Sequence, residues 1–240
     1  MSWFETWFDS PYYHILYKDR DEREAKLFID KIFEYLVTEQ GSKVWDLCCG
    51  KGRHSLELSK KGFHVTGTDL SQSSIGFALE FNSANLDFFV HDMREPFYVN
   101  YFNVVLNLFT SFGYFDKPSD DLKVIQSVYD SLRKGGNFVF DFFNAVAVEK
   151  KLVPSEVRTI DGIEFNITRK ITDNFVRKDI LFFHDFIEYK FSERVKLIDK
   201  DYMENLLRSV GFQTLTSFGN YNLEEFNPIE SERLILICTK

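Results

Sequence analysis

Two carboxylates in the first third of the chain stand where short apolar runs end. Asp46 closes the first run, Asp69 closes the second, and Gly50 and Gly52 lie in the turn that follows Asp46. Glycine lets the backbone bend sharply and lets a ligand approach it closely. An acid at the end of the second run can accept hydrogen bonds from ribose hydroxyls. This pattern indicates a site for a cofactor that carries a nucleoside.

The segment 43–69 must fold so that the turn after Asp46 and the turn after Asp69 meet at one edge of a sheet. We predict a strand that ends at Asp46, a helix that starts near Arg53, and a second strand that ends at Asp69. Such a helix points its free N–H groups and the positive end of its dipole at the turn. The strand–turn–helix–strand unit therefore presents the helix N-terminus and both acids to one ligand.

The glycine pattern separates two classes of cofactor. A dinucleotide needs Gly-x-Gly-x-x-Gly so that its pyrophosphate reaches the helix end, and Ser55 stands at the third glycine position here. Asp46 would also repel a pyrophosphate. It suits a cofactor with an ammonium group at that place. S-adenosylmethionine (SAM) has one, together with a ribose for Asp69, so the residues favour SAM.

A series of motifs in the same order resembles the class I SAM-dependent methyltransferases. The string DLCCGKG at 46–52 is similar to the family's Asp-Leu-Gly-Cys-Gly-x-Gly signature, with Cys48 in place of the first glycine. Residues 66–71 resemble its second motif, and 91–93 resemble the acid-bearing turn after its third strand. The resemblance covers nearly the whole chain and is to the bacterial small-molecule type with an antiparallel insert. The later motifs lie at 103–112, 134–136 and 209–212.

The resemblance implies SAM as the cofactor and assigns residues to its parts. Asp46 would face the ammonium end, Asp69 the ribose, and Asp92 the amino group of the adenine. In similar enzymes a tyrosine before the first long helix touches the cofactor, and Tyr13 is our first choice for it. The predicted cofactor-binding residues are Tyr13, Asp46, Cys48, Gly50, Gly52, Arg53, Asp69, Leu70, His91, Asp92, Met93, Asn107, Leu108 and Phe109.

The acceptor should lie beside the segment that follows the predicted strand 102–108, because ligands of open α/β sheets bind beyond the carboxyl ends of the strands. Ser111 and Tyr114 are predicted on the acceptor side. Asp141 and Asn144, near the end of the fifth predicted strand, could also reach the acceptor. The catalytic residues stay unknown, since no side chain stands out as a base. We expect no metal, because no carboxylate and histidine cluster occurs in the sequence.

The expected fold is α/β. It has a doubly wound, Rossmann-like, seven-stranded sheet with an antiparallel last strand, plus a small antiparallel β insert. Residues 20–155 and 199–240 form the predicted SAM-binding core, and residues 156–198 form the insert, which would cover the acceptor site. Alternation predicts three or four strands in the insert. One apolar face includes His184 and Phe186, and His184 is either a buried structural histidine or a group that faces the acceptor.

The segment 1–19 contains seven aromatic side chains and is predicted to be irregular. So many rings need a surface to cover. They form either a lid over the cofactor and acceptor or plain packing against the sheet edge or the insert. Tyr12 and Tyr17 are the alternatives to Tyr13 for a cofactor contact.

Apolar periodicity predicts the remaining elements of the core. The glycine pair at 135–136 should end the predicted helix 119–133. The predicted helices are 20–39, 72–82, 119–133 and 199–209, and the predicted strands are 86–90, 102–108, 137–142, 212–218 and 233–239.

Composition limits the class of partner. The chain has 240 residues, a net charge of -8 and a pI near 5.2, so a phosphate backbone is repelled and a nucleic-acid substrate is disfavoured. Its 3 Cys do not suggest a disulfide scaffold. The first residues lack a secretory pattern and no apolar stretch is long enough to span a bilayer. We expect a cytoplasmic enzyme with a small-molecule acceptor and no membrane partner; the oligomeric state is left open.

Three rival functions stay open at this point. An NAD-dependent dehydrogenase is opposed by Ser55 and by Asp46. A non-catalytic SAM-binding protein would keep the same motifs, since methyl transfer needs few diagnostic side chains. An RNA methyltransferase would require a concentrated basic patch on the folded surface.

Overall fold

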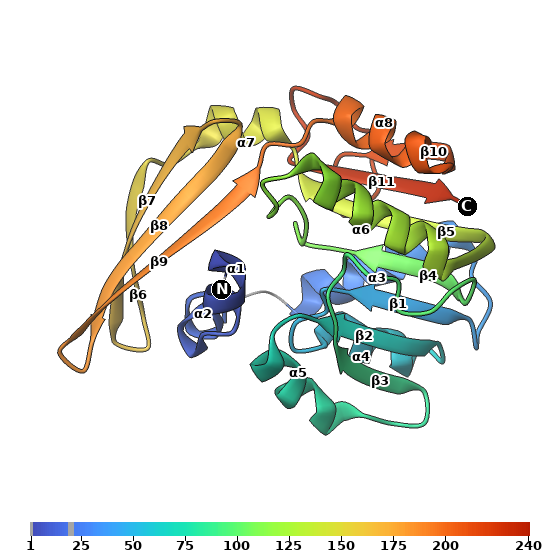
Figure 1. Ribbon diagram of the computed structural model, residues 1–240, viewed down its shortest axis with the longest axis horizontal. Coiled ribbons are helices and arrows are strands. Elements are labelled where there is room, and N and C mark those ends of the chain that lie inside the picture. The colour runs from blue at the N-terminus through green and yellow to red at the C-terminus, as the bar shows by residue number, and fades with distance from the viewer. Residues whose placement is uncertain (1, 19–21) are drawn as a thin grey trace.

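A seven-stranded sheet forms the centre of the protein (Figure 1). The structure is a computed structural model, and it describes residues 2–18 and 22–240. The strand order is β10-β11-β5-β4-β1-β2-β3. Neighbours from β5 to β3 are parallel, while β11 runs antiparallel to both β5 and β10. The predicted doubly wound sheet with an antiparallel last strand is confirmed. The strands are β1 (Lys43–Leu47), β2 (His64–Asp69), β3 (Leu86–Val90), β4 (Phe102–Asn107), β5 (Leu132–Phe143), β10 (Gln213–Phe218) and β11 (Arg233–Thr239).

Helices cover both faces of this sheet and bury two apolar layers (Figure 1). Helices α3 (Glu22–Leu36), α4 (Arg53–Lys60) and α5 (Gln72–Ala78) pack on one face, and α5 continues as the short 3₁₀ helix η1 (Leu79–Phe81). Helices α6 (Pro118–Ser131) and α8 (Lys200–Val210) pack on the other face. The middle of β4 is buried on both sides, so its run of Val104, Val105 and Leu106 suits a central strand.

Several predicted boundaries differ from those of the structure. The first long helix begins at Glu22 in the described residues, and residues 20–21 of the prediction lie outside them. Gly135 does not end α6: the helix ends at Ser131, and β5 starts at once with Leu132. The pairing of β5 with β4 then jumps from Leu132 to Asn137, and Gly135 takes a φ of +75° in the bulge between them.

The insert is a separate four-stranded antiparallel sheet that projects from the core (Figure 1). Its hairpin turns use left-handed residues at Asp161-Gly162, Asp173-Asn174 and Asp185-Phe186. Phe186 therefore sits in a turn, fully exposed, and the prediction that it shares an apolar face was wrong. Helix α7 (Ala145–Lys151) leads from the core into β6 (Ser155–Ile160), β7 (Ile163–Thr172), β8 (Phe175–His184) and β9 (Ile187–Lys196).

The N-terminal segment is helical, so the prediction that it is irregular was wrong. It forms α1 (Trp3–Phe8) and α2 (Pro11–Leu16), with Ser10 as the N-cap and Pro11 at the first position of α2. The two helices lie between the insert and the core (Figure 1). Trp7 and Leu16 join the apolar face of the insert in a third core cluster. These short helices are stable because they bury their rings, not because of length.

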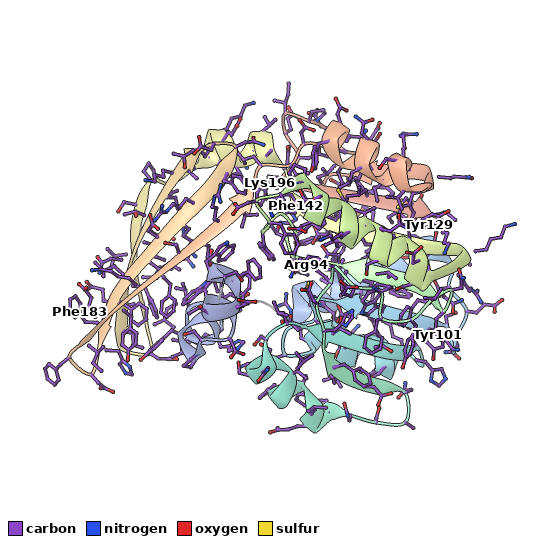
Figure 2. All side chains as sticks on the ribbon, viewed as in Figure 1. Arg94, Tyr101, Tyr129, Phe142, Phe183 and Lys196 are labelled. Carbon is purple, nitrogen blue, oxygen red and sulfur yellow. The ribbon has the colours of Figure 1, made fainter. Side chains whose placement is uncertain are left out.

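A buried ion pair joins the insert to the core where β9 ends. The Lys196 ammonium donates to Asp121 of α6, and the Tyr202 hydroxyl donates to the same carboxylate at 3.0 Å. Figure 2 shows Lys196 beside Phe142 at this junction, while Phe183 projects from the far end of the insert. The Lys196 backbone N–H also donates to the carbonyl of Gly113 at 2.8 Å. The insert is thereby held against the loop that follows β4.

Candidate functional site

A cavity of about 530 Å³ lies at the carboxyl ends of β1 to β4 and is closed on one side by α1 and α2. Its walls include most of the residues predicted from the sequence. Asn107 and His184 do not line it, and neither do Asp141 and Asn144. Those that do are Tyr13, Asp46, Cys48, Gly50, Gly52, Arg53, Asp69, Leu70, His91, Asp92, Met93, Leu108, Phe109, Ser111 and Tyr114.

Asp46 is held in place by the residue that breaks the dinucleotide pattern. Ser55 is fully buried at the start of α4, and its hydroxyl donates to Asp46 Oδ2 at 2.5 Å. Burial raises the pKa of the Asp46 carboxyl to about 6, although the Ser55 hydrogen bond opposes the change. A buried carboxylate of this kind gains from a cationic partner in the cavity.

Asp69 at the end of β2 is oriented by the backbone. Its Oδ2 accepts from the Gly50 N–H at 2.8 Å, and its Oδ1 accepts from the Ser71 N–H at 2.9 Å. Burial raises the pKa of this carboxyl too, against the lowering effect of those hydrogen bonds. Each oxygen keeps a second lone pair, so the carboxylate can accept from the two hydroxyls of a ribose.

The glycine turn fits a ligand that lies close to the backbone. Gly50 has a φ of +56°, and a Cβ built on it meets nothing within 4 Å, so the space above it is open. Gly52 has a φ of +82°, and its Cβ would come within 2.5 Å of the Phe88 ring. Gly50 thus leaves room for a ligand, and Gly52 leaves room for the Phe88 ring that packs under α4. Cys48 has a φ of +62°, a conformation for which glycine has no steric penalty.

The turn after β3 offers a third acid. Asp92 forms a bidentate pair with the Arg94 guanidinium, Nε to both carboxylate oxygens at 3.0 Å. Partial burial raises the pKa of Asp92, but the Arg94 hydrogen bonds outweigh it, and the net pKa is lowered. His91 Nε2 lies 2.7 Å from the carbonyl of Glu95, and the Met93 sulfur lies 3.6 Å from the sulfur of Cys48.

The segment after β4 forms the wall of the cavity next to the Asp46 end. Asn107 is buried behind this wall, where its Nδ2 donates to the Ser111 carbonyl at 3.0 Å. The Ser111 hydroxyl donates to the Leu108 carbonyl at 2.8 Å, and the Tyr114 hydroxyl donates to the Thr110 carbonyl at 2.7 Å. Ser111 and Tyr114 therefore shape the loop as well as line the cavity.

Two polar residues near the end of β5 do not reach the cavity, and the expectation that they reach the acceptor was wrong. Asp141 is fully buried and pairs with Arg233 of β11. Asn144 caps α7 and donates to the carbonyls of Pro228 and Ser231. His184, for its part, lies at the far end of β8, where its Nδ1 is 3.0 Å from the Tyr12 hydroxyl.

The N-terminal tyrosines divide between two environments. Tyr12 packs on Phe182 of the insert at a ring separation of 4.7 Å and does not line the cavity. Tyr13 and Tyr17 line the cavity, with their rings 5.0 Å apart. Phe4 and Phe8 line the cavity too, as the lid interpretation of segment 1–19 expects. Sequence reasoning gave no site role to several further lining residues, because no motif marks them; they include His14, Leu56, Phe77 and Phe115.

The sheet, the open glycine turn and the series of acids would suit a nucleoside cofactor with a cationic tail. The donor set fits SAM: Asp46 for its ammonium, Asp69 for its ribose and Asp92 for its adenine. Residues 44–136 match the family model of the methyltransferase domain. The chain is therefore similar to the class I SAM-dependent methyltransferases, a family whose cofactor is S-adenosylmethionine.

Curated relatives and a solved structure agree with this assignment. YqeM of Bacillus subtilis, named as a methyltransferase, is 32% identical over 121 residues, which is 49% of each chain. A glycine/sarcosine N-methyltransferase of Parasynechococcus marenigrum is 26% identical over 219 residues, 87% of this chain and 75% of that one. A SAM-dependent methyltransferase of Clostridium acetobutylicum has the same fold, with a TM-score of 0.80, 20% identity and 95% coverage of both chains. The chain spans about half the length of the first two curated relatives it matches.

Within residues 2–18 and 22–240, His, Cys, Asp and Glu side chains do not gather in groups of three or more that could hold a metal ion. None of the helices in the described part of the chain is both long and apolar enough to cross a membrane.

Proposed function

We propose that this protein transfers the methyl group of SAM to a small-molecule acceptor. The observation that carries the proposal is the row of three acids along one cavity: Asp46 on β1, Asp69 at the end of β2 and Asp92 after β3. These strands are neighbours in the order β1-β2-β3, so the acids can meet the ammonium, the ribose and the adenine of one extended cofactor.

The acceptor end of the cavity is then the side lined by α1, α2 and the loop after β4. When bound, SAM supplies a methyl group on a sulfonium, which is already a good electrophile. The protein's task is to align the acceptor and to exclude water. Phe4, Phe8 and Tyr114 pack together there, with ring separations of 6.3 Å and 5.3 Å to Tyr114. The insert supports this wall through its contact with α1 and α2.

Several observations favour a small acceptor. Aromatic side chains of the N-terminal helices close one side of the cavity, and the chain carries a net charge of -8, which opposes binding of a phosphate backbone. A relative that matches most of this chain is named for the methylation of glycine and sarcosine, which are small amines. Shorter matches are to proteins named as ribosomal RNA methyltransferases, so RNA is the alternative substrate to be tested. A cytoplasmic location is part of the proposal, and cell fractionation tests it.

Calorimetric titration with SAM and, separately, with NAD tests the cofactor. We expect micromolar binding of SAM and none of NAD. Incubation with SAM carrying a labelled methyl group and a cell extract, divided into a metabolite fraction and an RNA fraction, tests the acceptor. Label in the metabolite fraction supports the proposal, whereas label in RNA alone assigns the alternative. SAM binding without labelled product in either fraction would indicate a non-catalytic binding protein.

A further inference from the structure

The two residues that follow Leu108 have a strained backbone. Phe109 has a φ of +56° and Thr110 a φ of +65°. A bulky or β-branched residue rarely adopts this left-handed conformation, and two such residues in succession are rarer still. Strain of this kind persists only where surrounding contacts over-determine it, and it collects at functional sites.

A carboxylate behind the cavity holds both residues. Asp141 Oδ2 accepts from the Phe109 N–H at 2.7 Å, and the Asp141 carbonyl accepts from the Thr110 N–H at 3.0 Å. Arg233 Nε donates to Asp141 Oδ1 at 2.8 Å, and Arg233 Nη2 donates to Thr110 Oγ1 at 3.2 Å. The strained pair is thus fixed at two backbone N–H groups and one side chain.

The same pair sets the position of the cavity wall. The Phe109 ring lines the cavity and stacks on the imidazole of His54 at 4.9 Å. The Arg53 guanidinium lies 4.6 Å from the centre of that ring. The Thr110 carbonyl accepts from the Tyr114 hydroxyl. The conformation of residues 109–110 therefore also sets the position of Tyr114, a second residue that lines the cavity. Asp141 itself is buried and does not line the cavity, so it acts only through others.

We propose that Asp141 and Arg233 are positioning residues for the end of the cofactor that carries the methyl group. They hold residues 109–110 in the left-handed conformation, which places the Phe109 ring and Tyr114 against that end. Without them the segment relaxes and the wall moves. The inference rests on the proposed function, because it takes the segment after β4 to lie against the methionine part of SAM.

The test compares two ligands that share the adenine and ribose. SAM has the methionine part with its sulfonium methyl group, and adenosine lacks all of it. Thr110→Val keeps the shape of the side chain and removes the oxygen that Arg233 contacts, while Asp141→Asn places an amide against the Arg233 donors. We expect each variant to bind SAM at least tenfold more weakly and adenosine within twofold of the wild type. Thr110→Asn is the matched control, because asparagine tolerates the left-handed region and keeps an oxygen for Arg233; its SAM affinity should stay within twofold.

Amide hydrogen exchange gives a second readout that needs no cofactor. The Phe109 and Thr110 amides should be protected in the wild type and should exchange at least tenfold faster in Thr110→Val. Equal weakening of both ligands, or unprotected amides in the wild type, would overturn the positioning role. If Asp141→Asn fails to fold, Thr110→Val still decides. If the wild type binds neither ligand, the proposed function falls and the exchange rates alone decide the positioning role.

Discussion

Replacing Asp46 with asparagine should make the protein more stable at neutral pH and a weaker binder of SAM. Asparagine has nearly the same shape, and its side-chain oxygen can still accept from the Ser55 hydroxyl that bonds Asp46 Oδ2. The substitution therefore removes a charge and leaves the packing intact. What changes is the cost of keeping an ionised group in a buried place.

The magnitude follows from the pKa of the carboxyl. Asp46 is 2% exposed, and burial raises its pKa from the usual 3.8 to about 6. A raised pKa in the folded state means that folding favours the protonated form. This stabilising contribution is complete below the unfolded value of 3.8 and is lost as the pH rises through 6. The difference of about 2.2 pH units corresponds to about 3 kcal/mol that the ionised group costs at pH 8 and that asparagine does not.

Urea unfolding of both proteins at pH 5 and at pH 8 measures this cost. The wild type should lose about 1.4 kcal/mol of unfolding free energy relative to Asp46→Asn between these two pH values. Titrating groups that do not interact with Asp46 cancel in the difference between the two proteins. A gap that does not change between pH 5 and pH 8, or a variant less stable than the wild type at pH 8, would refute the reasoning.

The titration of Asp46 should also change the affinity for SAM. Protonated Asp46 has no charge to offer the ammonium of SAM, so the wild-type Kd should rise about tenfold from pH 8 to pH 5. Asp46→Asn should bind weakly at both pH values. A pH dependence that survives in the variant would assign it to another group.

Three further changes test neighbouring parts of the site. Asp69→Ala should weaken SAM binding by about 2 kcal/mol, roughly thirtyfold, since hydrogen bonds to a charged group are lost; an unchanged calorimetric Kd would remove this residue from the ribose site. Gly52→Ala should destabilise the fold by about 2–4 kcal/mol in urea, because its φ is +82° and its Cβ would lie 2.5 Å from the Phe88 ring. Gly135→Ala, with a φ of +75° and open space around it, is the matched control and should cost about 1 kcal/mol. Deletion of residues 2–18 should uncover the apolar face of the insert and produce binding of a hydrophobic dye, and a truncated protein that folds without binding dye would contradict the packing.

The sheet and its row of acids could be predicted because both depend on local patterns. Asp46 and Asp69 each follow an apolar run, and the carboxyl ends of parallel strands meet at one edge of the sheet. The alternation of strand and helix along the chain was therefore enough to predict that the two acids lie close together. The insert was visible for the same reason: alternating apolar residues bounded by turn signals at 161–162 and 173–174 indicate hairpins.

The parts that could not be predicted depend on contacts between distant residues. The hydrogen bond from the Ser55 hydroxyl to Asp46 explains why a serine stands where a dinucleotide site has glycine, but no sequence pattern predicts this bond. Asp141 meets Arg233 across 92 positions of the chain, and only that contact reveals that its carboxylate is unavailable to the acceptor. The N-terminal helices are short, and their stability comes from the surface of the insert that they cover.

The unusual features of this fold converge on one cavity, and each has a cost that a bound cofactor can offset. Asp46 and Asp69 are carboxylates whose burial opposes ionisation, and the ammonium of SAM bound as proposed would favour the ionised form of Asp46. Phe109 and Thr110 hold a strained backbone that contact with a ligand can stabilise. These destabilising features therefore lie at the proposed cofactor site, and SAM should raise the unfolding temperature most at a pH where Asp46 is ionised. The same burial that weakens the unliganded fold makes each charged contact with the cofactor stronger, because it excludes water from the site.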